Sequence, residues 1–202
     1  FPGPVDPAYA ASHAGAHTIT LDPTIPGWRS TGLYARPGRP VTVRFTGSWG
    51  EVASASTAGV HLQIGVWLDP QQFAERVRMQ PAITRVPVDA PRSRIASPIG
   101  GPLLIDLPEA LVAGRSADDP IDVVVRGAVP MPHFRLGETA LDDWRDEIRH
   151  RPVPWAELES DELVLTVPAA VVRELDRPDL VMEHWDRVHA TMHALQPRSP
   201  RH

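Results

Sequence analysis

The chain has 202 residues and a formal net charge of −5, which argues against a nucleic-acid-binding protein because such proteins are normally basic. It contains no Cys, and this excludes disulfides, thiolate nucleophiles and zinc sites built from cysteine. No apolar run approaches the roughly 18 residues that a membrane-spanning helix requires, so we expect no membrane span.

The two ends of the chain have the composition of irregular segments. Residues 1–27 are rich in Pro, Gly and Ala, which predicts a lead-in or linker. The chain begins at Phe1, with neither Met nor a basic-then-apolar signal region, so we expect a processed protein or an excised piece of a longer one. Residues 196–202 are expected to be a frayed end or a truncation.

Residues 28–137 have the periodicity of β-strands. Apolar and polar side chains alternate over 41–45 and over 60–69, as they do in strands that bury one face. Turns rich in Gly and Pro separate the runs, and no helical pattern intervenes. We therefore predict an antiparallel, β-sandwich-like subdomain, with a third clear strand at 121–125 and shorter strands at 83–88 and 103–107.

Residues 138–195 change to a helical period. Leu141, Trp144 and Ile148 have helical spacing, and Thr139 precedes them as the predicted N-cap. One strand is predicted at 163–167, and a short helix follows at 169–175. The fold class expected for the chain is α+β: an antiparallel β-sandwich-like N-terminal part followed by a mostly helical segment.

The last helix is the most regular in the sequence. Asp179 is its predicted cap, and its apolar stripe is Val181, Trp185, Val188, Met192 and Leu195. Asp186, His189 and His193 flank the stripe and share a face, so their spacing would let them contact one metal ion. Solvent-facing polar residues are also expected there, and no Glu stands between the histidines to activate a water. We predict no metal site in this chain.

Sequence motifs for catalysis are missing. The chain has no His-Glu-x-x-His, no Gly-x-Ser-x-Gly and no phosphate-binding loop. Paired carboxylates occur in positions typical of solvated or helix-capping residues, so no catalytic residue is predicted. These pairs are Asp118-Asp119, Asp142-Asp143 and Asp161-Glu162.

The six Trp residues fall into two groups. Trp144 and Trp185 lie on helical apolar stripes and are predicted to be core residues. The other four are Trp28, Trp49, Trp67 and Trp155, and they lie in turns or on the polar side of a strand. An exposed Trp ring is a flat platform for a sugar or a protein partner.

Four blocks of sequence follow one another between residues 31 and 195. They are Thr31-Gly32-Leu33-Tyr34-Ala35-x-Pro37-Gly38-x-Pro40-Val41-Thr42-Val43, then Ile95-x-Ser97-Pro98-x-Gly100-Gly101, then Gly127-Ala128-Val129 with Pro132-x-Phe134-x-Leu136-Gly137-x-Thr139 and Trp144, and finally Pro152-x-Pro154-Trp155-Ala156-Glu157-Leu158 with Leu175-x-x-Pro178 and Trp185-Asp186. The ordered series resembles the N-terminal portion of the peptidase domain of the enhancin-type, mucin-targeting zinc metallopeptidases, peptidase family sixty.

The resemblance implies a secreted or cell-surface parent enzyme that cleaves O-glycosylated proteins with zinc. Its His-Glu-x-x-His helix would lie beyond this chain, which would be inactive alone and would have the remainder of the peptidase domain and a glycoprotein or glycan as partners. No zinc ligand of the family has a matching position here. Gly100, Gly101 and Trp155 are the predicted substrate contacts, although the glycines also suit a tight turn or a close approach to a neighbouring strand, and the Trp155 ring also suits packing at the junction of sheet and helix.

A second interpretation is a free-standing carbohydrate-binding or adhesion β-sandwich, with Trp28, Trp49 or Trp67 as sugar platforms. Such a module should expose coplanar Trp rings. A portion of a peptidase domain should instead expose an apolar surface near its last helix, where the catalytic part would dock.

Overall fold

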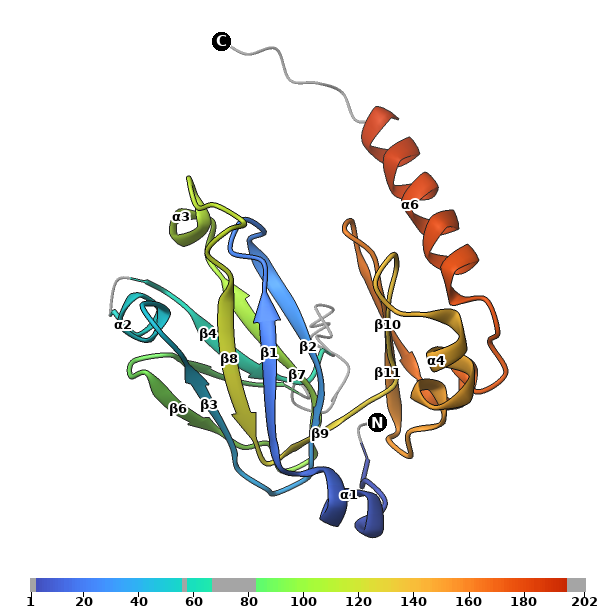
Figure 1. Cartoon of the computed structure of the whole chain (residues 1–202), viewed down its shortest axis with the longest axis horizontal. Helices are drawn as coiled ribbons and strands as arrows, with labels where there is room; N and C mark the ends of the chain where they lie inside the picture. The colour runs from blue at the N-terminus through green and yellow to red at the C-terminus, as the bar shows by residue number, and fades with distance from the viewer. Residues whose placement is uncertain (1–2, 56–57, 67–82, 196–202) are drawn as a thin grey trace, which may run out of the picture. The chain divides into compact units, whose positions relative to one another are not determined.

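A computed structural model describes residues 3–55, 58–66 and 83–195 of the chain (Figure 1). It has three sheets and several helices, so the α+β class is confirmed. The chain divides into two compact units. The first comprises Phe1–Met131 with Pro152–Pro154, and the second comprises Pro132–Arg151 with Trp155–His202.

The first unit contains two sheets, and every strand pair in them is antiparallel. The four-stranded sheet has the order β1 (Ala16–Leu21), β8 (Ile121–Arg126), β3 (Val41–Phe45), β6 (Arg92–Ile95). The five-stranded sheet has the order β5 (Thr84–Pro87), β4 (His61–Ile64), β7 (Gly101–Leu107), β2 (Gly27–Ala35), β9 (Ala128–Pro130).

Alternation along the strands builds the core between these sheets. In β3, Val41, Val43 and Phe45 are buried, whereas Thr42 and Arg44 lie on the other face. Strands of both sheets contribute to one hydrophobic cluster, which confirms the sandwich-like arrangement. Two short helices, α2 (Trp49–Ser54) and α3 (Glu109–Val112), also contribute residues to this cluster.

The N-terminal residues differ from the expected lead-in, because they hold regular structure. Helix α1 (Pro7–His13) begins after Asp6, whose Oδ1 accepts a hydrogen bond from the Tyr9 amide at 2.8 Å. Strand β1 follows and pairs along its whole length with β8. The linker was predicted from the abundance of Pro and Ala. The same residues are compatible with a helix, because Pro suits its first turn and Ala favours its interior.

The second unit packs helices on a three-stranded sheet. Strand β11 is central, parallel to β10 and antiparallel to β12. The core of the second unit holds Phe134, Trp144 and Met182. The elements are β10 (His133–Arg135), α4 (Leu141–Asp146), the 3-10 helix η1 (Ile148–His150), β11 (Trp155–Glu159), β12 (Val164–Pro168), α5 (Ala169–Val172) and α6 (Pro178–Leu195).

Three predictions for this unit need correction. The segment 138–195 holds two strands, β11 and β12, which pair with each other, whereas only one strand was predicted there. Thr139 does not cap α4: its Oγ1 accepts the Arg135 amide at 2.9 Å, and Ala140 takes the cap position. Helix α6 begins at Pro178, so Asp179 lies within its first turn.

Within the described ranges, no helix is both long enough and apolar enough to cross a membrane.

Candidate functional site

Gly100 and Gly101 are buried beside other backbone of the first unit. Gly100 has φ of 73°, and a Cβ at this residue would lie 2.5 Å from the Ala35 carbonyl oxygen. A Cβ on Gly101 would lie 3.0 Å from the Gly65 Cα atom. These glycines therefore let segments of the chain's own backbone lie close together. Their contact with substrate stays a prediction.

The tryptophans divide differently from the prediction. Trp144 is a core residue, as expected, but Trp185 on α6 is 43% exposed. Trp28 is 42% exposed, and the Arg85 guanidinium lies 4.9 Å from its ring centroid. Trp49 is buried, and its indole Nε1 donates to the Asp119 carbonyl oxygen at 3.2 Å. Trp67 lies outside the described residues.

Trp155 begins the central strand of the second unit and is half-buried, opposite Pro168 of β12. Ala156 and Leu158 of the same strand belong to the hydrophobic core. Because side chains alternate along a strand, Trp155 shares the opposite face of the sheet with Glu157 and Glu159. Trp155 is therefore placed on the polar side of its sheet.

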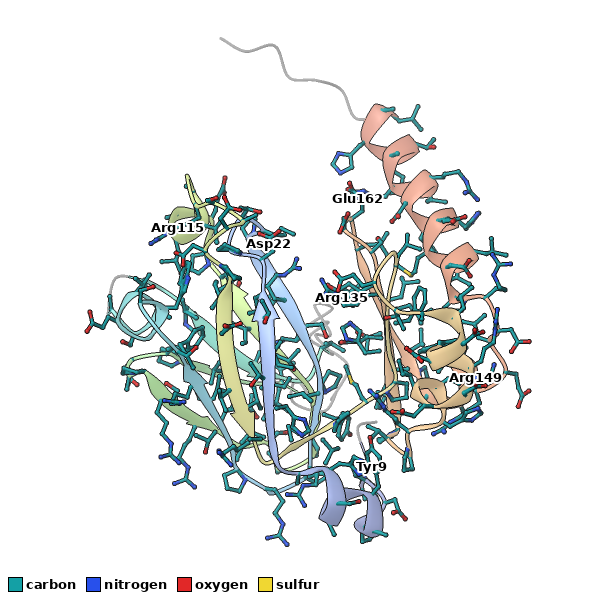
Figure 2. The ribbon with its side chains drawn as sticks, viewed as in Figure 1. Tyr9, Asp22, Arg115, Arg135, Arg149 and Glu162 are labelled. Atoms are coloured by element: carbon teal, nitrogen blue, oxygen red, sulfur yellow. The ribbon has the colours of Figure 1, made fainter. Side chains whose placement is uncertain are left out.

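Two buried carboxylates on that face were missed by the sequence analysis. Glu159 Oε2 lies 2.7 Å from His133 Nε2 and 3.7 Å from Arg135 Nε (Figure 2 labels Arg135). Glu157 is fully buried, and its Oε1 accepts a hydrogen bond from Thr166 Oγ1 at 3.4 Å. The signal was present as Glu alternating with Ala and Leu, but alternation alone predicts that the polar positions face solvent.

A groove of about 620 Å³ runs along α6 within the second unit. His189 Nδ1 lies 3.1 Å from Glu162 Oε2, and Figure 2 shows Glu162 beside the helix. His193 Nε2 lies 3.1 Å from His189 Nε2, and Asp186 Oδ1 accepts the Ser160 hydroxyl. The groove is lined by Leu136, Asp161, Glu162, Asp186, Arg187, His189, Ala190 and His193.

The groove's side chains do not fit a zinc ion. A structural or catalytic zinc site needs at least three protein ligands converging on one point. Asp186 is bonded to Ser160 instead of converging with His189 and His193. Across residues 3–55, 58–66 and 83–195, no three His, Cys, Asp or Glu side chains converge in this way.

The apolar stripe of α6 is only partly covered. Met182 is fully buried in the core of the second unit, and Val181 packs against that core. Towards the end of the helix, Met192 is 61% exposed and Leu195 is 78% exposed. A large apolar side chain in water costs free energy unless something covers it, so this end of α6 is a candidate contact surface.

Comparisons with known proteins identify a matching family and several relatives. Residues 127–202 match the family described as Peptidase M60, enhancin and enhancin-like. The human TRPM8 channel-associated factor 1 is 36% identical over 179 residues, and its homolog from Xenopus laevis is 34% identical over 175 residues. In both cases the alignment covers 85% of this chain but only 18% of the relative, so the chain spans about a fifth of these proteins.

Solved structures share the fold. The IMPa metallopeptidase from Pseudomonas aeruginosa aligns with a TM-score of 0.59 and 17% identity over 86% of this chain and 20% of its own. The ZmpB metallopeptidase from Clostridium perfringens aligns with a TM-score of 0.61 and 16% identity over 87% of this chain and 40% of its own. With the family match, these findings confirm the predicted resemblance: residues 127–202 match the enhancin-like peptidases of family M60, and the chain shares its fold with two solved metallopeptidases.

Proposed function

We propose that the chain is the β-rich, non-catalytic N-terminal portion of a zinc metallopeptidase domain that acts on O-glycosylated, mucin-like proteins. The parent enzyme would be secreted or held at the cell surface. A His-Glu-x-x-His helix elsewhere in the parent would bind the zinc, since the 202-residue sequence of this chain does not contain that motif. The family match over residues 127–202 supports the assignment to a peptidase domain.

The observation that carries the proposal is the exposed apolar end of α6. Trp185, Met192 and Leu195 lie on the helical stripe within the residues that match the peptidase family, and all three are exposed. This is the surface expected of a domain portion whose catalytic remainder docks on its last helix. Burial of such side chains contributes about 25 cal/mol per Å² of apolar area, which favours the contact.

The substrate class is supported by relatives of the same fold. Solved structures of IMPa include a complex with an O-glycopeptide and a complex with T-antigen. By analogy, the parent of this chain would act on a glycan-bearing peptide. Trp155 is the best placed of the three proposed contacts, because Gly100 and Gly101 are packed against the chain's own backbone.

The first test is the purified chain incubated with an O-glycosylated mucin, with and without a metal chelator. We expect no chelator-sensitive cleavage. Robust cleavage by the chain alone would overturn the claim that its catalytic residues lie elsewhere.

The second test uses a longer parent polypeptide that contains both this chain and a His-Glu-x-x-His segment. It should cleave an O-glycopeptide in a chelator-sensitive manner, and the double substitution Met192→Glu with Leu195→Glu should reduce cleavage at least tenfold by preventing docking. Thr191→Glu, at the exposed position directly before Met192, is the control and should retain activity.

The carbohydrate-binding module remains a second candidate because Trp28 is partly exposed. Arg85 already stacks on its ring, and the burial of Trp49 removes a second platform. Glycan-array binding that is abolished by Trp28→Ala would favour the module. The names of the curated relatives describe channel-associated factors, so a parent that is inactive towards glycopeptides would favour a binding role of that kind.

A further inference from the structure

Four arginines gather on the outer face of the four-stranded sheet. Arg44 lies on β3, Arg92 and Arg94 lie on β6, and Arg126 ends β8, strands that lie side by side in Figure 1. Arg44 is directly opposite Arg92, and Thr42 is opposite both Arg94 and Arg126. All four arginines are exposed. We call them the arginine face.

The guanidinium groups of the arginine face are not paired with carboxylates of the described residues. Within the described part of the chain, none of its guanidinium groups makes an ion pair or a hydrogen bond. Asp122, which β8 carries on the same side, is hydrogen-bonded by Thr20 Oγ1 at 2.7 Å. Like charges directly opposite each other on neighbouring strands destabilise a sheet.

A depression of about 170 Å³ lies within the arginine face. It is lined by Thr42, Arg44, Arg92, Val124 and Arg126, so a hydroxyl and three guanidinium groups surround one small apolar side chain. The planar fork of Arg donates two parallel hydrogen bonds to a carboxylate, sulfate or phosphate oxygen pair. The depression therefore suits an oxyanion.

The spacing of the arginines suits more than one anionic group. Neighbouring strands lie about 4.8 Å apart, and residues two apart in a strand are separated by about 6.6 Å. Four guanidinium groups on such a grid extend well beyond one sulfate or carboxylate. An open sheet face also favours a chain that lies across it over a small molecule that needs enclosure.

We propose that the arginine face binds an acidic glycan through its sulfate or carboxylate groups. The choice of a glycan rests on the proposed function, in which the parent acts on O-glycosylated proteins; the oxyanion chemistry rests on the arginines alone. The face would then hold sulfated or sialylated substrate chains near the enzyme.

The test is calorimetric titration of the chain, at low salt, with a sulfated oligosaccharide, a sialylated oligosaccharide and a neutral O-glycan disaccharide. We expect one or both acidic probes to bind and the neutral probe not to bind. Binding should weaken as salt is raised, because exposed charges are screened. The double variant Arg44→Gln with Arg92→Gln should bind the acidic probe at least about tenfold more weakly, since each charge-assisted hydrogen bond contributes about one such factor.

The matched control is Arg115→Gln with Arg187→Gln, which removes the same charge elsewhere and should bind like the unaltered chain. The thermal midpoint of Arg44→Gln with Arg92→Gln should not fall, because the substitutions remove opposed like charges. If that variant fails to fold, Arg94→Gln with Arg126→Gln provides the same test.

Failure of both acidic probes to bind, or equal binding by the arginine variants, would overturn the proposal. A short DNA duplex that binds as tightly as the acidic glycans would overturn the choice of a glycan. These readouts need no cleavage, so their failure is distinct from failure of the peptidase proposal, which is tested by chelator-sensitive cleavage.

Discussion

Gly100 shows how one residue can be required for a reason that spacing does not reveal. The sequence Gly100-Gly101 permits a close approach of backbone, either to a substrate or to another strand. The structure places the Ala35 carbonyl oxygen and Pro37 where a side chain of residue 100 would stand. The sequence indicated that a glycine is required at position 100. The backbone that leaves no room for a side chain there comes from a distant part of the sequence.

Substitution of Gly100 by Ala should therefore be costly. The Cβ would meet the Ala35 carbonyl oxygen at 2.5 Å, in addition to the strain of φ at 73°. We expect a loss of about 3 kcal/mol or more in the free energy of unfolding, measured by urea denaturation. Gly38→Ala, at φ 66° with open space around it, is the control and should cost about 1 kcal/mol. Equal effects of the two substitutions would contradict the packing role of Gly100.

At the scale of elements, α6 combines two environments on one helix. Its first turns contribute Met182 to the core, whereas its later turns leave Met192 in solvent. The helical period predicted Met192 on the apolar stripe and did not include Met182, and periodicity cannot distinguish a covered stripe from an uncovered one. The strands of the same unit show the converse, because Glu157 has the alternation of a solvent-facing residue and is fully buried.

The contrast along α6 predicts different effects of the same substitution. Met182→Ala should lower the free energy of unfolding by about 2–5 kcal/mol, because it leaves a cavity in the core. Met192→Ala should change it by less than about 0.5 kcal/mol. Chemical denaturation of the two variants measures both. A large loss of stability in Met192→Ala would mean that this end of the helix is already packed, and would remove the support for docking there.

At the scale of the whole molecule, the N-terminal segment is part of the first unit. The Tyr34 hydroxyl donates to the Gly3 carbonyl oxygen and accepts from the Gly3 amide, each at 2.9 Å. Tyr9 donates its hydroxyl to the Pro130 carbonyl oxygen at 2.9 Å, and β1 completes the four-stranded sheet. Contacts over 31 and 121 residues of sequence hold this segment, and no local pattern announces them.

Tyr34 makes stability depend on pH in the alkaline range. Burial raises the pKa of its hydroxyl from 10.0 to about 12. The unfolded chain therefore loses this proton first, so the contribution of Tyr34 is complete below pH 10 and is lost as pH rises towards 12. We expect a fall of roughly 2–3 kcal/mol in the free energy of unfolding over that range.

Urea denaturation at a series of pH values from neutral to alkaline measures this dependence. Tyr34→Phe should flatten the curve between pH 10 and 12, although it costs about 1 kcal/mol at neutral pH through the lost hydrogen bond. Tyr9→Phe, which removes a different hydroxyl of the same unit, should keep the slope. A slope that persists in Tyr34→Phe would assign the alkaline transition to other groups.

The sequence by itself determined the α+β class, the alternating strands of the sandwich, the last helix and the resemblance to enhancin-like peptidases. These follow from side-chain periods of 2 and 3.6 residues and from ordered local blocks, which are properties of neighbouring residues. Only the tertiary structure decided that residues 1–27 hold a helix and a strand, that Glu157 and Glu159 are buried, that Trp185 is exposed and that four arginines form one face. Each of these depends on which distant segments pair or pack together, and the free energy of such pairing is shared between residues that no local window contains.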